Sequence, residues 1–211
     1  TLYAGSYQDW QVAQVFKSTN SGATWAASDA GITSTGVLSL AIDPTNGTSI
    51  YAATYNGIFK STNSAATWVA SNSGLTSLWT LTLAIHPASP ATLFAGTRYG
   101  GVFKSTNSGD TWAAANTGLT EVRVEALAID PSTSGTLYSG TYSSGVFKSS
   151  NSGDTWTAAN TGLTNLRIRA LAIDPTTPAR LYAGTYGGGV FHSFNGGGTW
   201  AAMNSGLTSL N

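Results

Sequence analysis

The chain has 211 residues, and its nine Lys and Arg residues balance nine Asp and Glu residues, so its formal net charge is zero. The sequence has no basic surplus that would neutralise phosphates, which argues against nucleic acid as a partner. It has no apolar run of the roughly 18 residues needed to cross a bilayer, and without cysteine it holds neither a disulfide framework nor a thiolate metal site.

Five tryptophans mark an internal repeat. They are 43 or 44 residues apart and stand at Trp25, Trp68, Trp112, Trp156 and Trp200. A period near 44 residues falls in the range of propeller blades. We therefore predict an all-β fold: a β-propeller of about five four-stranded antiparallel blades. The single domain is expected to cover 1–211, with repeats at about 1–49, 50–92, 93–136, 137–180 and 181–211.

Each repeat resolves into four short apolar runs bounded by Gly, Pro and polar turns, which is typical of strands. In the last full period they are an inner strand at 169–173, two middle strands at 181–185 and 190–193, and an outer strand at 199–202. The other inner strands are predicted at 38–42, 81–85 and 125–129, so the first repeat lacks one. Three explanations stay open: a five-bladed ring with one three-stranded blade, a piece of a longer array, or chains that complete one another through the unpaired edge.

The eight residues before and including each tryptophan predict a tight turn between the third and the outer strand. In the copy at 105–112, Ser105 and Asn107 can hydrogen-bond to the backbone, and Gly109 can adopt positive φ. Trp112 offers a large apolar face to fill the space between blades. We call these segments boxes; they span 18–25, 61–68, 105–112, 149–156 and 193–200.

The boxes resemble the Asp-box, or BNR repeat, of sialidases, xyloglucanase-type glycosidases and sortilin-type receptors. The resemblance implies a propeller whose boxes lie on the face away from the active site. The residues that carry it are Ser18, Asn20, Gly22 and Trp25; Ser61, Asn63 and Trp68; Ser105, Asn107, Gly109 and Trp112; Ser149, Asn151, Gly153 and Trp156; and Ser193, Asn195, Gly197 and Trp200. Asn stands where the family has Asp, and Ala65 replaces one glycine. The turn should survive these changes, but the lost carboxylates argue against a calcium or magnesium role.

Ligand-binding residues are expected on the opposite face, because loops on a rigid scaffold concentrate binding function. One column of turns between the middle strands holds Tyr7, Tyr55, Arg98, Tyr142 and Tyr186, and Tyr99 follows Arg98. Tyrosine rings suit the C–H faces of sugars, and their hydroxyls can hydrogen-bond to sugar hydroxyls. The alternative is that each tyrosine packs on the neighbouring turn.

Two further tryptophans stand outside the boxes. Trp10 belongs to a four-residue insertion in the first repeat, which either extends the binding face or covers the edge left by the missing strand. Trp79 aligns with Arg123 and Arg167 in the loops that precede the inner strands, near the predicted central channel. Stacking on a ligand and plugging the channel are both compatible with Trp79.

The only concentration of charge lies in the same loops. Glu121, Arg123 and Glu125 alternate at period two, which predicts that they share one face of a strand. Glu125 and Arg169 are expected to be neighbours in an ion pair between blades, with an anion or polar-ligand site as the alternative. On one extended strand Glu121 and Glu125 would stand about 13 Å apart, too far for the carboxyl pair of a glycosidase.

These patterns predict a non-catalytic, lectin-like binding module that recognises glycans. One alternative is a structural propeller that contacts protein partners through its incomplete blade, and another is a glycoside hydrolase, sialidase-like or xyloglucanase-like, or a fragment of one. No cofactor or metal is predicted, because neither histidine has a second ligand at metal-binding spacing. The chain begins at Thr1, so we expect a processed product or a piece of a longer protein, located outside the cell, with any signal peptide already removed.

Overall fold

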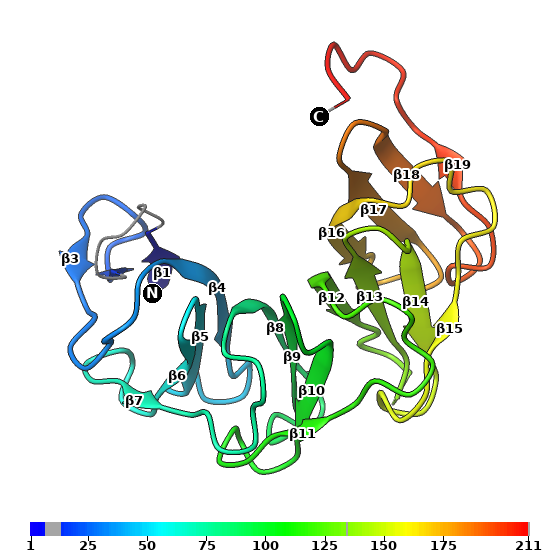
Figure 1. Cartoon of the computed structure of the whole chain (residues 1–211). Coiled ribbons are helices and arrows are strands. Elements are labelled where there is room, and N and C mark those ends of the chain that lie inside the picture. Colours follow the sequence, from blue (N-terminus) through cyan, green and yellow to red (C-terminus); the bar gives the residue numbers. More distant parts are fainter. Residues whose placement is uncertain (7–13, 134, 211) are drawn as a thin grey trace. The chain divides into compact units, whose positions relative to one another are not determined.

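The computed structural model describes residues 1–6, 14–133 and 135–210, and it contains strands and turns but no helix in these ranges. Its residues cluster into two compact units, and Figure 1 shows the strands coloured in chain order. The first unit comprises residues 1–97 and 103–113, and the second comprises residues 98–102 and 114–211. That all repeats form one domain remains a prediction.

The described residues form five sheets in which strands pair in chain order. The first sheet has three strands: β1 (Leu2–Gly5), β2 (Val15–Ser18) and β3 (Ala26–Ala27). The second contains β4 (Val37–Ile42), β5 (Ile50–Thr54), β6 (Gly57–Ser61) and β7 (Val69–Ala70), and the third β8 (Thr80–Ile85), β9 (Leu93–Thr97), β10 (Val102–Ser105) and β11 (Ala113–Ala114). The fourth contains β12 (Val124–Ile129), β13 (Leu137–Thr141), β14 (Val146–Ser149) and β15 (Thr157–Ala158), and the fifth β16 (Ile168–Ile173), β17 (Leu181–Thr185), β18 (Gly189–Ser193) and β19 (Ala201–Ala202).

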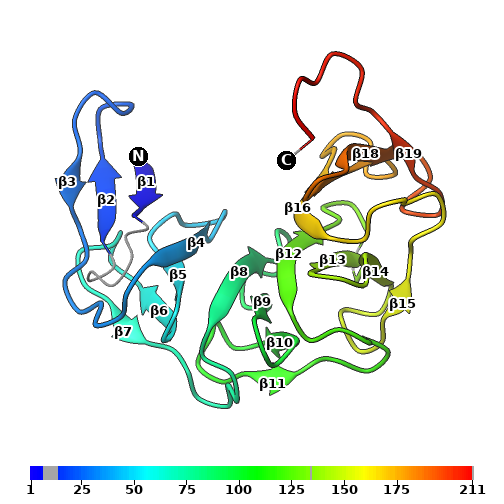
Figure 2. The same ribbon diagram turned by 45° about the horizontal axis from the view of Figure 1, so that its top comes forward.

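The predicted strand plan is confirmed in the described residues, where the first sheet has three strands and lacks an inner one. Within each unit successive sheets pack beside one another, β4 next to β8 and β12 next to β16 (Figure 2). The core lies between them: in the second unit Tyr138 packs with Leu163, Ile168 and Trp200. These sheets are therefore arranged like the blades of a propeller within each unit.

The outer strands are shorter than predicted. The expected strand at 199–202 is reduced to Ala201–Ala202, and the other outer strands also have two residues each. In the fifth sheet the backbone N–H of Trp200 donates to the carbonyl of Thr161, in the loop after the preceding box, at 2.8 Å. This N–H therefore takes no part in the pairing of β19 with β18.

The hydrogen bonds predicted for the box turn are confirmed. Ser105 Oγ accepts from the N–H of Gly109 at 2.9 Å, and Asn107 Oδ1 accepts from the N–H of Thr111 at 2.9 Å. In the second box Ala65 adopts a φ of 66° and its N–H still reaches Ser61 Oγ at 3.0 Å. The turn therefore tolerates the replacement of its glycine.

Each inner strand carries an irregularity near its start. The pairing of β12 with β13 shifts register between Val124 and Ala126, so Glu125 is an extra residue, and Arg169 occupies the same place in β16. The expectation of one continuous strand through Glu121 and Glu125 is wrong, because β12 begins only at Val124. Such bulges redirect side chains, and here they affect the two charged residues of the predicted ion pair.

Candidate functional site

The loops that lead into β12 and β16 and the turns that follow β13 and β17 form a charged aromatic cluster in the second unit. The N–H of Tyr142 donates to the carbonyl of Arg123 at 3.1 Å, and the N–H of Tyr186 donates to the carbonyl of Arg167 at 2.9 Å. These backbone bonds hold each arginine beside the tyrosine of its own sheet. We call Arg123, Glu125, Tyr142, Arg167, Arg169 and Tyr186 the Arg–Tyr cluster.

Arginines and tyrosines alternate through this cluster. The Cζ atom of Arg123 lies 4.0 Å from the ring centroid of Tyr142, and that of Arg167 lies 4.5 Å from the same centroid. Arg167 is also 4.0 Å from the centroid of Tyr186. Guanidinium groups at these distances are attracted to the ring faces. The prediction that tyrosines pack on the neighbouring turn therefore describes Tyr142 well, since its ring is occupied by arginines.

Glu125 joins the two sheets of the second unit. Its carboxylate accepts a hydrogen bond from Arg123 Nε at 2.6 Å and another from Arg169 Nη1 at 3.1 Å. The predicted contact between Glu125 and Arg169 is confirmed, and the Glu125 side chain is only 10% exposed. A partly buried carboxylate shared by two arginines orients both guanidinium groups.

Glu121 is a hydrogen-bond acceptor at the edge of the cluster. It accepts from Ser143 Oγ at 2.5 Å and from the N–H of Arg123 at 3.0 Å. Partial burial acts to raise the pKa of Glu121, but these hydrogen bonds and the charge of Arg123 outweigh it and lower the pKa from its ordinary value. An ionised carboxylate of this kind is a poor general acid. Ser143 was not predicted, because its neighbours in the column, Asn56, Tyr99 and Gly187, share no chemistry with it.

One polar atom of the cluster is left without a partner. Arg167 Nε is buried and makes no hydrogen bond within the described part of the chain. Buried N–H groups nearly always have a partner in native proteins, so such an atom calls for a functional or structural explanation. It lies in the guanidinium group held between Tyr142 and Tyr186.

The other predicted ligand-binding residues form separate pairs. In the first unit Tyr55 meets Trp79 edge to face, with centroids 4.7 Å apart. In the second unit Arg98 Nε donates to the hydroxyl of Tyr99 at 2.8 Å, and the Tyr99 side chain remains 63% exposed. Tyr7 and Trp10 lie outside the described residues. The structure thus brings together Arg123, Tyr142, Arg167 and Tyr186 from the predicted set.

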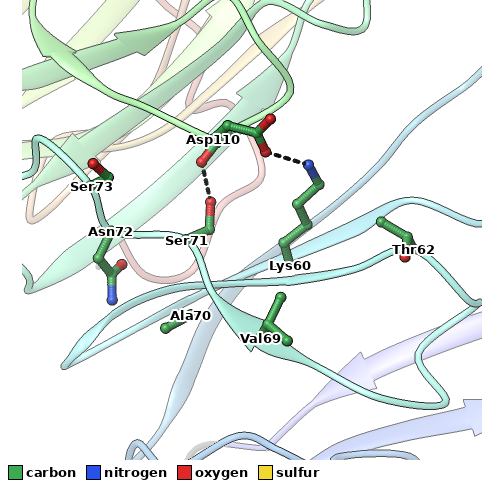
Figure 3. Close-up of a pocket in the computed structure, with 9 residues that line it drawn as sticks. Lys60, Thr62, Val69, Ala70, Ser71, Asn72, Ser73 and Asp110 are labelled. Atoms are coloured by element: carbon green, nitrogen blue, oxygen red, sulfur yellow. Dashed lines mark hydrogen bonds and ion pairs between the residues drawn. The ribbon is translucent and has the colours of Figure 1, made fainter.

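A separate pocket of about 310 Å³ lies beside a box in the first unit (Figure 3). Lys60 and Asp110 form an ion pair of 3.0 Å at its edge, and Ser71 donates to the carbonyl of Gly109. The Asp110 side chain is 69% exposed. These contacts link a strand to the box of the next sheet, so the pocket is a by-product of blade packing, and no ligand is assigned to it.

Within residues 1–6, 14–133 and 135–210, no group of three or more His, Cys, Asp or Glu side chains is arranged to hold a metal ion. The same ranges contain no helix long and apolar enough to span a membrane.

No family model and no curated protein matches this chain. Among solved structures, a GH74 enzyme from Niastella koreensis is 25% identical with a TM-score of 0.74, over 90% of this chain and 34% of that one. The extracellular domain of a putative one-component system from B. thetaiotaomicron is 17% identical with a TM-score of 0.69, over 93% and 27%. The structure named YCF48 bound to D1 peptide is 17% identical with a TM-score of 0.65, over 95% and 63%.

The chain thus spans about a quarter to under two thirds of the length of these structures. The likenesses concern the fold, and they agree with the four-stranded antiparallel sheets described above. The chain is a β-propeller protein, and its sheets are the blades.

Proposed function

We propose that the Arg–Tyr cluster of the second unit is a non-catalytic carbohydrate-binding site. The observation that carries the proposal is Tyr186, a residue that is 49% exposed and has the Arg167 guanidinium 4.0 Å from its ring centroid. A sugar offers a C–H face to such a ring and hydroxyls to the polar groups around it.

The cluster narrows the set of tyrosines that a sugar can use. The ring of Tyr142 has two guanidinium groups within 4.5 Å of its centroid, so little of its face is left for stacking. Tyr186 is the tyrosine of the cluster with an exposed ring. Around it, Arg169 has a side chain that is 39% exposed and can donate to sugar hydroxyls. We therefore assign stacking to Tyr186 and hydrogen bonding to Arg169.

The comparisons support a carbohydrate as the ligand class. Besides the enzyme from Niastella koreensis, the GH74 xyloglucanase from Xanthomonas campestris resembles this chain at 16% identity, with a TM-score of 0.55 over 94% of this chain. Xyloglucan oligosaccharides are therefore the first probe. The extracellular domains among the similar structures support a location outside the cell.

The carboxylates of the cluster support binding rather than hydrolysis. Glu125 is engaged by two arginines, and Glu121 is engaged by Ser143 and a backbone N–H. A glycosidase needs one carboxyl group that can deliver a proton to the leaving group. Hydrogen bonds that favour the ionised form of Glu121 oppose this role.

The test is calorimetric titration of the chain with xyloglucan oligosaccharides and a panel of other neutral glycans. Tyr186→Ala should weaken binding at least about fivefold, since loss of stacking on an aromatic side chain costs on the order of 1–3 kcal/mol. Phe194→Ala is the matched control, because Phe194 is an exposed aromatic residue of the fifth box and should not affect binding. Equal affinity of wild type and Tyr186→Ala would refute the site, and release of reducing ends would refute the non-catalytic role.

A second candidate function is peptide binding at β1. This strand pairs with β2, and in the described residues it occupies the edge where the other sheets have an inner strand. An extended peptide can add to such an edge through backbone hydrogen bonds. A labelled peptide with the sequence of 168–173 should bind, as measured by fluorescence anisotropy. Equal binding of a scrambled peptide would argue against strand addition.

A further inference from the structure

The same interface between a box tryptophan and the loop after the preceding box occurs at four places in this chain. At the first of these places Trp68 Nε1 donates to the carbonyl of Ser28 and its backbone N–H donates to the carbonyl of Ala30, both at 2.8 Å. Trp112, Trp156 and Trp200 repeat both bonds with the third and fifth residues after the preceding box. Each of these four tryptophans thus donates two hydrogen bonds to the loop after the preceding box.

A glycine in that loop lets the tryptophan approach. Gly31 has a φ of +100°, and a Cβ atom on it would stand 2.2 Å from the carbonyl oxygen of Trp68. Gly74, Gly118 and Gly162 stand in the same relation to the following tryptophans, at 2.0 to 2.1 Å. The next residue is apolar; in two of the copies it is buried, as Ile32 and Leu163. The accepting half of the interface is therefore two carbonyls, a glycine and an apolar side chain.

In the first box, Trp25 could donate the same two hydrogen bonds, but the described residues provide no acceptor for it. The Trp25 side chain is 44% exposed, whereas the other four box tryptophans are 3–5% exposed. The turn that presents Trp25 is intact, because Asn20 Oδ1 accepts from the N–H of Thr24 at 2.9 Å as in the other boxes. No hydrogen bond from the Trp25 indole occurs within the described ranges. We call Ser21, Gly22 and Trp25 the Trp25 face.

The loop after the last box could accept the same two hydrogen bonds, but no box tryptophan of the described residues donates to it. Gly206 has a positive φ of +84°, as its equivalents have positive φ, but no atom of the described residues lies within 4 Å of a Cβ atom placed on it. Leu207 is 48% exposed although the equivalent Leu163 is 9% exposed. The loop already has the required shape, since the N–H of Leu207 donates to the carbonyl of Asn204 at 3.0 Å and that of Leu163 to Asn160 at 2.9 Å. We call Met203, Ser205, Gly206 and Leu207 the Gly206 face.

We propose that the Trp25 face of one copy of this chain docks on the Gly206 face of a second copy. The four interfaces within the chain predict the contacts: Trp25 Nε1 donates to the carbonyl of Met203, and the Trp25 N–H donates to that of Ser205. Tyr182 adds a third bond, from its hydroxyl to the carbonyl of Ser21, as Tyr138 does to Gly196 at 3.0 Å. This interface is head to tail, so successive copies associate into a closed ring or an open chain of molecules.

Sedimentation velocity over a range of concentrations tests the proposal. The wild-type chain should form species larger than the monomer as its concentration rises. Trp25→Ala should weaken association at least about thirtyfold, because a buried interface tryptophan is a typical hot spot. Gly206→Ala should do the same, since its Cβ atom would meet the carbonyl of the docked Trp25. Tyr99→Ala is the matched control: it also removes an exposed aromatic ring, outside both faces, and should associate as the wild type does.

Mixing the two variants distinguishes this interface from any other. Trp25→Ala retains a normal Gly206 face, and Gly206→Ala retains a normal Trp25 face. An equimolar mixture should therefore form dimers and nothing larger, whereas each variant alone stays monomeric. Circular dichroism of both variants checks that the sheets are retained. Three results would overturn the proposal: a wild type that is monomeric at all concentrations, association that persists in both variants, or a mixture that forms no dimer.

Discussion

The backbone of Gly118 lies directly against the carbonyl oxygen of Trp156. A Cβ atom on Gly118 would stand 2.1 Å from that oxygen, and the φ of Gly118 is +90°. Any other residue at this position would therefore lower the stability of the fold in two independent ways. Its side chain would disfavour the positive φ, and its Cβ atom would clash with the Trp156 carbonyl. Gly206 also has a positive φ, but it has no such contact within the described part of the chain. Comparing substitutions at Gly118 and Gly206 therefore separates the cost of the backbone conformation from the cost of the clash.

Gly118→Ala should destabilise the chain by about 2–4 kcal/mol, as positive φ and overpacking add. Gly206→Ala should cost only the conformational part, about 1 kcal/mol. Urea unfolding under conditions in which the chain is monomeric measures both changes. Equal losses for the two variants would show that the contact with Trp156 contributes nothing.

The box asparagine is predicted to be replaceable by aspartate but not by alanine. Asn107 Oδ1 accepts from Ser105 Oγ and from the N–H of Thr111. Asn107→Asp keeps this oxygen and should change the free energy of unfolding by less than about 1 kcal/mol, whereas Asn107→Ala should cost about 1–3 kcal/mol. Chemical denaturation of the two variants decides the point, and a loss for aspartate as large as that for alanine would contradict it.

Removal of the Glu125 charge should destabilise the second unit. In Glu125→Gln the guanidinium groups of Arg123 and Arg169 lose their shared counter-charge, and we expect a loss of about 1–2 kcal/mol after allowing for the exposure of both arginines. Asp110→Asn is the control, because its ion pair with Lys60 is exposed and should be worth less than about 1 kcal/mol. Thermal melts at low and high salt compare the variants. An equal loss in both would rule out a special role for Glu125.

Acid should weaken the turns that end the inner strands. Partial burial acts to raise the pKa of Asp130, but hydrogen bonds from Ser132 and Thr133 outweigh it and lower the pKa from 3.8. A lowered pKa in the folded state stabilises the protein above the unfolded value, and this stabilisation is lost as the pH falls through the folded pKa.

The corresponding measurement is the free energy of unfolding at about pH 7 and about pH 2.5. Asp130→Asn should lose less stability between these values than the wild type does, because the substituted side chain does not titrate. If the variant loses as much unfolding free energy between these pH values as the wild type does, the loss comes from other carboxylates.

Spacing and local chemistry in the sequence were enough to determine the blades. The tryptophan period, the apolar runs and the box turns involve residues close together in the chain, so the strand order, the missing inner strand and the hydrogen bonds of Ser105 and Asn107 were predictable. The contact of Glu125 with Arg169 was also predictable, because equivalent residues of neighbouring repeats stand side by side.

Only the tertiary structure decided which side chains pack against one another between neighbouring repeats. Whether the Tyr142 ring meets a sugar or a guanidinium depends on Arg167, and whether a box tryptophan is buried depends on a glycine about 37 or 38 residues earlier. Repeats with nearly identical sequences differ in these respects because packing energy arises between sheets, and a side chain's partners there lie tens of residues away in the sequence.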